Sequence, residues 1–315
     1  MNEVERVFSE NRDYLWGHCY RMLGVAADAE DVVQETFVRA LEKPPADLDR
    51  PWRPWLLTVA SRLALDQLRR RRRRGWVGPW LPEPVELSPE TAATEASIEP
   101  EQQTRAERAD SLSYAFLLAL EALSPQQRAV LLLRDVQELS GEETAAALGI
   151  SLANVKVVLH RARKVLATAR ERLPVLDNKQ KQRIGQALQR LLAALAGGDL
   201  AAIEAALAAD VRLLTDGGGH YHAAKKPVLG RLKVATFLNK LRPQPEETVY
   251  RELRSLNGIP GIYAERPSPP PGLAPRFALL VDVGDNGLVR EIYSVLAPAK
   301  LSRQRLLAPA AGAGP

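Results

Sequence analysis

The sequence predicts a multidomain protein in which two all-α helical domains are followed by an α+β domain. Three observations support this fold class. Apolar residues recur at helical spacing over residues 1–74 and again over 106–174. A segment rich in Pro, Glu, Thr and Ala separates these two stretches, and runs typical of β-strands gather in the last third of the chain. A length of 315 residues also suits two or three domains.

The same composition changes give the domain boundaries. The linker contains the stretch Trp80-Leu81-Pro82-Glu83-Pro84, and the C-terminal tail is expected to be disordered. We therefore divide the chain into a first helical domain (1–74), a linker (75–105), a second helical domain (106–174), an α+β domain (177–301) and a tail (302–315).

Charge and cysteine content narrow the class of partner. The formal net charge is +5, but Arg69 to Arg74 are six consecutive arginines. Such a block favours an anionic partner, which is most often nucleic acid and less often an acidic membrane surface. The single cysteine, Cys19, allows no intrachain disulfide. With no signal-peptide pattern and no apolar run of about 20 residues, we expect a cytoplasmic protein that does not enter a membrane.

Two amphipathic helices are predicted in the first domain. After Asp28, an expected N-cap, Val33, Phe37 and Leu41 follow at i, i+4 and i+8. The opposite face of this helix is polar and carries Glu30, Asp31, Gln34, Glu35 and Arg39.

The next helix is expected to begin after the stretch RPWRP, with Leu56, Val59, Leu63 and Leu68 as its apolar stripe. Its other face carries Arg62, Asp66, Arg69 and Arg70. Trp52 and Trp55, near its start, could stack on unpaired bases or pack in the core. We expect Trp55 in the core and leave Trp52 open.

The second helical domain contains a predicted helix-turn-helix. Ser124 and Ser140 each begin a capping box, Gly149 supplies the sharp turn, and Ser151 caps the second helix. The exposed face of that helix would carry Asn154, Lys156, His160, Arg161 and Arg163. Such a face is typical of a helix that binds DNA, although a basic helix that is merely solvated has the same pattern.

The α+β domain is expected to begin with two helices. The first carries Ile184, Leu188 and Leu191 on one face and ends at Gly197-Gly198, and a short helix follows from about Asp199. Several antiparallel strands should follow, with a helix inserted near 231–241. The stretch Asp285-Asn286-Gly287 predicts a hairpin turn between the last two strands.

The stretch TDGGGHYHAAKKPVLG, residues 215–230, allows several interpretations. Asp216, His220 and His222 could act as an acid/base set if they converged on one cavity. A metal site would lack an evident third ligand, and no phosphate-loop pattern is present. We instead predict a hairpin in which VRLLT and HYHAA are the strands and Asp216, Gly217, Gly218 and Gly219 form the turn. No catalytic residue, metal or cofactor is expected.

Two modules resemble the regions of a known family. The stretches DAEDVVQETFVRAL and PWLLTVASRLALDQLRRRRR resemble region 2 of an extracytoplasmic-function (ECF) sigma factor, and LSPQQRAVLLLRDVQELSGEETAAALGIS with VKVVLHRARKVL resembles region 4. WLPEP at 80–84, the DGGG turn and APAKL at 297–301 are similar to marks of the sigma J-like group, which carries a SnoaL-like extension. The resemblance implies two helical sigma domains followed by an α+β SnoaL-like cone.

The resemblance also implies roles. Asp31, Gln34, Glu35 and Arg39 would dock on the β′ clamp helices of core RNA polymerase, with the β flap as a further contact. Arg62, Asp66, Arg69 and Arg70 would bind the −10 element, and the region 4 helix would read the −35 element. Trp80, Leu81, Pro82, Glu83 and Pro84 would contact the Asp216–Gly219 turn, through which the extension modulates activity. Whether the extension also binds a small ligand stays open.

Three departures from the family pattern are visible. Val157-Val158 stand where many members have Ser-Arg, His220 stands where Lys or Arg is more frequent, and Ala297-Pro298-Ala299 stand for Asn-Pro-Asp. Valine cannot make the bidentate guanine contact of arginine, so base readout would shift to other residues of the helix. Two rival functions fit the same sequence features: a ligand-responsive helix-turn-helix regulator that does not bind core polymerase, and an enzyme tethered to DNA-binding modules.

Overall fold

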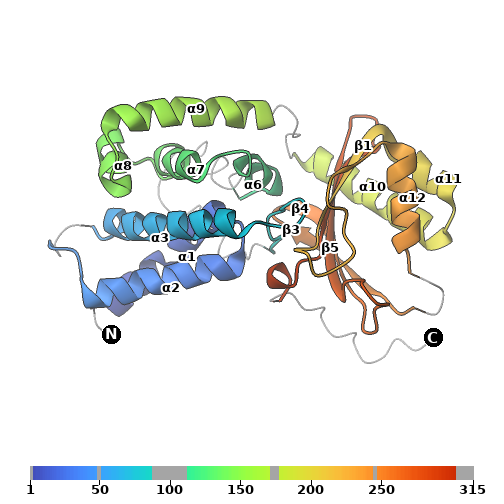
Figure 1. The fold of residues 1–315 in the computed structure, drawn as a ribbon, viewed down its shortest axis with the longest axis horizontal. Helices are drawn as coiled ribbons and strands as arrows, with labels where there is room; N and C mark the ends of the chain where they lie inside the picture. Colours follow the sequence, from blue (N-terminus) through green and yellow to red (C-terminus); the bar gives the residue numbers. More distant parts are fainter. Residues whose placement is uncertain (1–2, 48–50, 87–111, 171–176, 244–246, 303–315) are drawn as a thin grey trace. The chain divides into compact units, whose positions relative to one another are not determined.

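The chain forms two compact units in a computed structural model that describes residues 3–47, 51–86, 112–170, 177–243 and 247–302 (Figure 1). The first unit comprises Met1–Gly75 and Leu87–Leu173, and the second comprises Trp76–Glu86 and Pro174–Pro315. The segment from Trp76 to Glu86, which we call the linker strap, thus belongs to the second unit. The rest of the predicted linker, the start of the second helical domain before 112 and nearly all of the predicted tail lie outside the described residues.

The first unit begins with α1 (Glu3–Leu23), α2 (Ala26–Glu42) and α3 (Arg53–Arg74). The predicted N-cap of α2 was wrong: Val25 occupies that position, and Asp28 lies in the first turn, where a carboxylate favours the helix N-terminus. Leu41 is 61% exposed, against the prediction that it continues the buried stripe. Eight residues advance the helix about 80° beyond two full turns, so i+8 leaves the buried face.

The second half of the first unit contains the predicted helix-turn-helix. Both capping boxes are present, Ser124 with Gln127 and Ser140 with Glu143. Gly149 has a φ of 64° in the left-handed region, and the Ser151 hydroxyl accepts the Asn154 N–H at 3.2 Å. The elements of this half are α6 (Tyr114–Leu120), α7 (Pro125–Leu131), the π-helical turn η1 (Leu132–Val136), α8 (Gly141–Leu148) and α9 (Leu152–Arg170).

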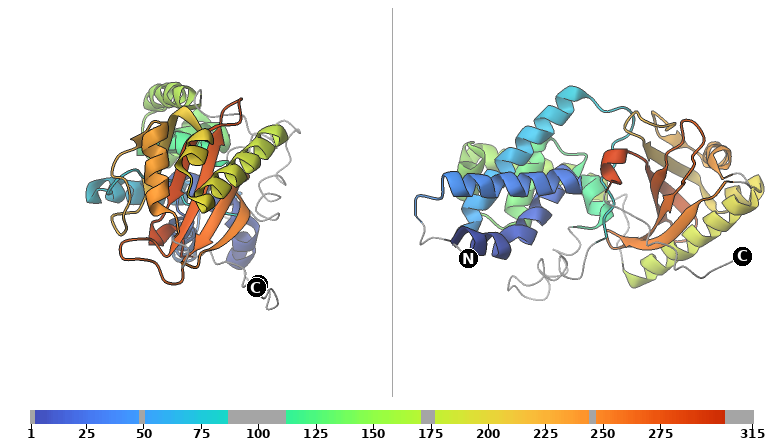
Figure 2. Two further views of the ribbon diagram at one scale, coloured as in Figure 1. Left: turned by 90° about the vertical axis from the view of Figure 1, so that its right-hand side faces the viewer. Right: turned by 90° about the horizontal axis from the view of Figure 1, so that it is seen from below.

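The second unit is an α+β domain built on a six-stranded mixed sheet of order β2-β1-β6-β5-β4-β3. Figure 2 shows α10 lying across one face of this sheet. The helices α10, α11 and α12 are Asn178–Gly197, Leu200–Ala205 and Arg231–Leu241. The strands are β1 (Leu207–Asp216), β2 (Val228–Leu229), β3 (Tyr250–Leu256), β4 (Ile259–Glu265), β5 (Arg276–Val283) and β6 (Val289–Val295). This architecture confirms the predicted fold class.

Two details of the sheet differ from the prediction. β1 pairs with β6 in parallel, whereas only antiparallel strands were expected. The two strands are far apart in the sequence, so no tight turn imposes their direction. The stretch HYHAA is not a strand, because the His222 N–H donates to the Gly272 carbonyl at 2.7 Å instead of to β1. The strand that pairs with β1 here is β2, whose Leu229 lies opposite Arg212.

The last hairpin agrees with the prediction. β5 and β6 are antiparallel, and Gly287 in the Asp285-Asn286-Gly287 turn has a φ of 73°. None of the helices in the described segments is long and apolar enough to cross a membrane.

Candidate functional sites: exposed basic helices and a buried linker strap

The polar face of α2 is open. Asp31, Gln34, Glu35 and Arg39 are all exposed, and Arg39 Nε lies 3.0 Å from Glu35 Oε1. Two apolar side chains share the exposed surface of this helix, Val38 at 47% exposure and Leu41 at 61%. The prediction missed this apolar component. A helix face that mixes charges with uncovered apolar groups is typical of a protein-binding surface.

The predicted DNA face of α3 is exposed at Arg62, Asp66, Arg69 and Arg70. Arg69 Nη1 lies 3.2 Å from Asp66 Oδ1, an exposed pair that leaves the guanidinium accessible. Arg62 differs from the other three. It donates to the carbonyl of Ala147 at 2.7 Å and to that of Ala146 at 3.0 Å.

These carbonyls belong to the last turn of α8, where backbone acceptors lack helical partners. Arg62 therefore caps α8 of the helix-turn-helix in this structure. In that arrangement its guanidinium is engaged by the protein itself.

The two tryptophans at the start of α3 lie in different environments, and the expectation for Trp55 was wrong. Trp52 is 7% exposed and packs edge-on against Trp55, with ring centroids 6.4 Å apart. Trp55, which was expected in the core, is only half-buried. Trp52 precedes the helix and turns back onto the bundle, so a helical repeat alone could not assign the two environments. Trp55 is the more accessible of the two indoles.

The second helix of the helix-turn-helix, α9, presents the predicted basic face. Its inner side is held by a cluster of Val130, Val155, Val158 and Leu159. Of the two valines that replace the family's Ser-Arg, Val158 is thus a core residue, whereas Val157 is 48% exposed. The outward side chains, all exposed, are Asn154, Lys156, His160, Arg161 and Arg163.

Arg163 is less available than its neighbours on α9. Its Nε and Nη2 donate to the two carboxylate oxygens of Asp135 at 2.9 and 2.6 Å. This bidentate pair raises the pKa of Arg163. Arg161 is exposed on the same helix, so it is the better candidate for contact with DNA.

The linker strap is buried over five consecutive residues, 81–85. Leu81, Pro82, Glu83, Pro84 and Val85 are all buried in the second unit. Five consecutive buried residues are unusual for a segment whose composition is typical of an extended linker.

The end of the strap is fixed by Asn257, which lies between β3 and β4. The Val85 N–H donates to the Asn257 side-chain oxygen at 2.9 Å, and the Asn257 N–H donates to the Val85 carbonyl at 2.7 Å. One residue further on, Glu86 forms an ion pair with Arg254 at 3.4 Å.

The start of the strap is fixed by Asp216, the last residue of β1. This carboxylate has no exposed surface and accepts three hydrogen bonds besides an ion pair. The donors are Trp76 Nε1 at 3.0 Å, the Leu81 N–H at 2.8 Å and the Gly218 N–H at 3.2 Å. The ammonium of Lys300 completes the set at 2.6 Å. We call Asp216, Lys300, Trp76, Trp80 and Leu81 the Asp216 cluster.

Lys300 is 1% exposed and connects three elements of the second unit. Its Nζ also donates to the Leu81 carbonyl at 2.5 Å. It lies 3.8 Å from the centroid of the Trp80 ring and 4.7 Å from that of Trp76. A buried ammonium is stabilised where a carboxylate, a carbonyl and aromatic faces surround it.

The glycines after Asp216 are required by close contacts. A Cβ on Gly217 would lie 2.8 Å from the Ala223 side chain, and one on Gly218 would lie 3.2 Å from the Trp76 ring. Gly218 also has a φ of 58°, which favours glycine. The DGGG stretch therefore lets the backbone approach the strap.

Sequence reasoning missed three residues of this arrangement. Lys300 lies within the quoted APAKL stretch, and Asn257 within an Asn-Gly dipeptide between two predicted strands, so both carried a signal. Trp76 precedes the quoted WLPEP motif; a tryptophan in a linker is itself unusual, but no contact with Asp216 was predicted for it.

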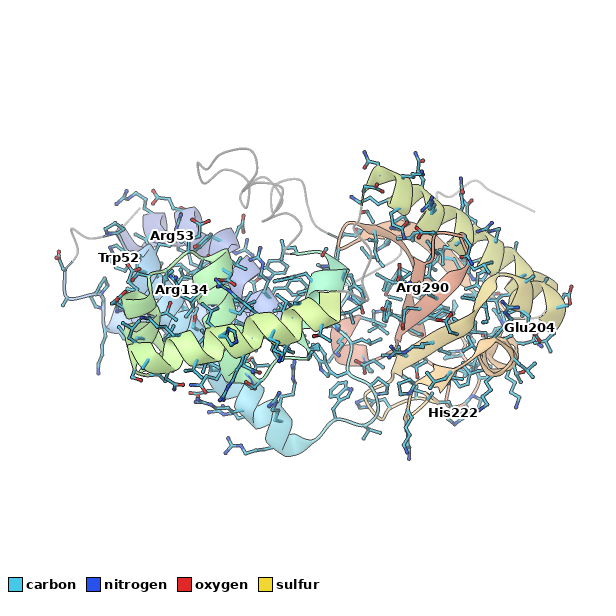
Figure 3. The ribbon with its side chains drawn as sticks, turned by 90° about the horizontal axis from the view of Figure 1, so that it is seen from above. Trp52, Arg53, Arg134, Glu204, His222 and Arg290 are labelled. Carbon is cyan, nitrogen blue, oxygen red and sulfur yellow. The ribbon has the colours of Figure 1, made fainter. Side chains whose placement is uncertain are left out.

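The acid/base interpretation of Asp216, His220 and His222 is not supported by the geometry. Asp216 is enclosed by the Asp216 cluster, whereas His220 and His222 are exposed. Figure 3 shows His222 at the periphery of the second unit. The structure does not bring the three side chains to one cavity. Among the residues it describes, there is also no group of His, Cys, Asp and Glu that could hold a metal ion.

Comparison with known proteins defines the class of protein to which this chain belongs. Residues 7–74 match the Sigma-70 region 2 model and residues 113–166 match Sigma-70 region 4. The protein is thus built on the two regions of a sigma-70-type transcription factor.

One relative narrows the class further. The ECF RNA polymerase sigma factor SigJ of Mycobacterium tuberculosis is 34% identical over 260 residues, which are 81% of this chain and 79% of the relative. The chain belongs to the family of ECF RNA polymerase sigma factors.

Two further comparisons agree with this family assignment. SigG of the same organism, also an ECF sigma factor, is 38% identical over 207 residues, which are 60% of this chain and 55% of the relative. The crystal structure of M. tuberculosis SigJ superposes with a TM-score of 0.67 at 29% identity. The superposition covers 95% of this chain and 98% of the other, so the fold extends over the C-terminal unit as well.

Proposed function

We propose that this sigma factor binds core RNA polymerase in the cytoplasm through the exposed face of α2 and directs initiation at promoters with −10 and −35 elements. Asp31, Gln34, Glu35 and Arg39 would contact the β′ clamp helices, and Val38 and Leu41 would add apolar contact. The region 4 unit would contact the β flap. The observation that carries this proposal is the uncovered mixed face of α2.

DNA binding is assigned to two basic faces. Asp66, Arg69 and Arg70 on α3 would contact the −10 element, with Arg62 joining them once it leaves α8. Of the outward residues of α9, Asn154, Lys156, His160 and Arg161 would contact the −35 element, whereas Arg163 is held by Asp135. The apolar side chain of Val157 suits a thymine methyl group, which partly replaces the arginine readout of other members.

The C-terminal unit is proposed to be a regulator rather than an enzyme. The strap lies in the sequence between region 2 and region 4. When Asp216, Lys300 and Asn257 hold it, less chain is free to link the two DNA-binding regions. A shorter free linker raises the effective concentration of region 4 at the −35 element once region 2 is bound.

Charge reversal on α2 tests the polymerase contact. The double variant Asp31→Lys/Glu35→Lys should fail to co-purify with core polymerase and should lose run-off transcription. Glu10→Lys, an exposed reversal on α1, is the matched control and should bind normally. If the double variant binds core polymerase like the unaltered protein, the α2 assignment fails. If the unaltered protein itself fails to co-purify with core polymerase, the rival function, a regulator that does not bind polymerase, gains support.

A further inference from the structure

The second unit contains a partly open cavity of about 120 Å³ against the sheet. Its apolar wall includes Leu213, Phe237, Ile262, Phe277 and Leu279, from three strands and α12. An apolar cavity of about 150 Å³ in another protein takes up benzene, so this volume suits a single ring or a short chain. The cavity is therefore large enough for the apolar part of a small molecule.

Cationic side chains interrupt this apolar lining. Arg242, Arg251 and Arg266 all line the cavity, the imidazole of His222 lies beside them in the lining, and the described lining residues include no carboxylate. Arg266 is only 6% exposed and lies 5.4 Å from the centroid of the Phe277 ring. Burial lowers the pKa of this guanidinium, and the charge of Glu247 opposes the shift.

One carboxylate lies close behind the cavity wall. Glu247 Oε1 is 3.3 Å from Arg266 Nε and offsets one of the three arginines. Arg266 Nη2 donates to the Leu241 carbonyl at 2.9 Å. Two guanidinium charges, on Arg242 and Arg251, are not offset by any acid in the described lining. The local field therefore favours an anion.

The cavity wall is continuous with the strap's attachment. Thr215 and Leu296 line the cavity, and Thr215 precedes Asp216 in β1. The N–H groups of Leu296 and Ala297 both donate to the Asp216 carbonyl, at 2.8 and 3.0 Å. His222 lines the cavity from the loop that follows the glycines. A molecule in the cavity would thus touch the elements that hold Asp216 in place.

We propose that this cavity binds a small amphipathic carboxylate, with its apolar part among the leucines and phenylalanines and its carboxylate toward the arginines. Occupancy stabilises the end of β1 and the loop after it, and so tightens the Asp216 cluster on the strap. This second step rests on the proposed regulatory role of the strap, whereas the binding step does not.

Binding is tested by calorimetric titration of the full chain with 3-phenylpropionate and octanoate. The matched neutral probes are 3-phenylpropan-1-ol and octan-1-ol. We expect each acid to bind about tenfold more tightly than its alcohol, which corresponds to about 1.4 kcal/mol. Equal affinities, or no binding of either acid at millimolar concentration, would overturn the proposal.

Two variants locate the site. Arg251→Ala removes an exposed cavity arginine and should abolish the preference for the acids. Arg183→Ala removes an arginine of α10 that pairs with Asp285 and does not line the cavity, and should leave the preference intact. If Arg183→Ala and Arg251→Ala weaken the acids equally, general charge attraction explains the binding and the cavity assignment is wrong.

The coupling between the cavity and the strap is measured separately, by hydrogen exchange. With 3-phenylpropionate bound, peptides covering 76–86 and 214–224 should exchange more slowly, whereas a peptide from α2 should not change. Binding without slower exchange of the strap would overturn the coupling step. Because these readouts need neither polymerase nor promoter, failure here is distinct from failure of the sigma-factor role.

Discussion

Lys300 and Asp216 form an ion pair of 2.6 Å although neither side chain is more than 1% exposed. The two residues lie 84 positions apart in the chain, and both also bond to Leu81 of the strap. The pair therefore joins the end of β1, the C-terminal segment and the strap in one network. A network of this kind is strongly coupled, so its members should not act independently.

Breaking the pair should destabilise the second unit. Lys300→Met leaves the buried Asp216 carboxylate without its cation, which costs about 3–5 kcal/mol of unfolding free energy. Asp216→Asn should cost a comparable amount. In the double variant Asp216→Asn/Lys300→Met neither charge remains, so its cost should be well below the sum. Urea unfolding of the unaltered protein, the two single variants and the double variant completes this double-mutant cycle. If the unfolding free energy lost in the double variant equals the sum of the two single losses, the two residues are not coupled.

The strap should loosen at its other end when Asn257 is changed. Asn257→Ala removes the side-chain oxygen that accepts the Val85 N–H, and we expect about 1–3 kcal/mol of destabilisation. Hydrogen exchange at Val85 should accelerate more than exchange in α10. Unchanged exchange at Val85 would mean that the strap is held by its Asp216 end alone. Ser255→Ala on the neighbouring strand is an exposed control.

Acid should weaken the first unit through His18. This imidazole is fully buried, its Nε2 lies 2.8 Å from the Ser61 hydroxyl, and burial, with the nearby charge of Arg21, lowers its pKa to about 3. The unfolded chain takes up a proton at its ordinary pKa of about 6.5, and the folded chain does not. Stability from this residue is therefore present above pH 6.5 and falls as the pH drops toward 3.

His18→Gln should remove this part of the pH dependence. The measurement is the unfolding free energy at pH 7.5 and at pH 5.5 for both proteins. The variant should be less stable at pH 7.5 but should lose less on acidification. Equal losses in the two proteins would show that His18 is not the responsible group.

Glu291 should give the second unit the opposite pH response. Burial raises its pKa to about 7, and Arg212, 3.4 Å away, opposes the shift. Because the folded pKa exceeds the unfolded one, the folded state holds the extra proton between about pH 4.5 and 7. The stability contributed by this residue is thus present below pH 4.5 and is lost as the pH rises through 7. Glu291→Gln should flatten this slope, and an unchanged slope would contradict the assignment.

Arg161→Ala should weaken binding to a −35 fragment and lower the salt slope by about one. The matched control is Arg163→Ala, since Arg163 is already bound to Asp135. Fluorescence anisotropy at several salt concentrations measures both. If Arg163→Ala has the larger effect, the assignment of the exposed α9 residues must be reversed.

The helices could be predicted from the sequence more fully than the site could, for physical reasons. Capping boxes at Ser124 and Ser140 and the turn at Gly149 are local devices, so a short stretch of sequence suffices to predict them. The burial of Trp52, the direction of β6 and the pairing of β2 with β1 depend on distant partners. Local patterns carry no information on those choices.

The contact of the strap with DGGG was expected from a resemblance, and the structure supplies its chemistry. Asp216 was predicted as a turn residue, but its carboxylate receives donors from Trp76, Leu81 and Lys300. Together with Asp216 itself, these residues come from three separate parts of the chain. Only a folded sheet could reveal that Lys300 is the cation of this network.

The most direct test of the account is run-off transcription with purified core polymerase, comparing the full chain with Lys300→Met and with a chain ending after residue 176. Both changes free the strap and lengthen the free linker, so both should lower promoter-directed transcription about fivefold or more. Arg183→Ala should transcribe normally. If the chain ending after residue 176 and Lys300→Met both transcribe as well as the intact protein, the C-terminal unit does not regulate initiation through the strap.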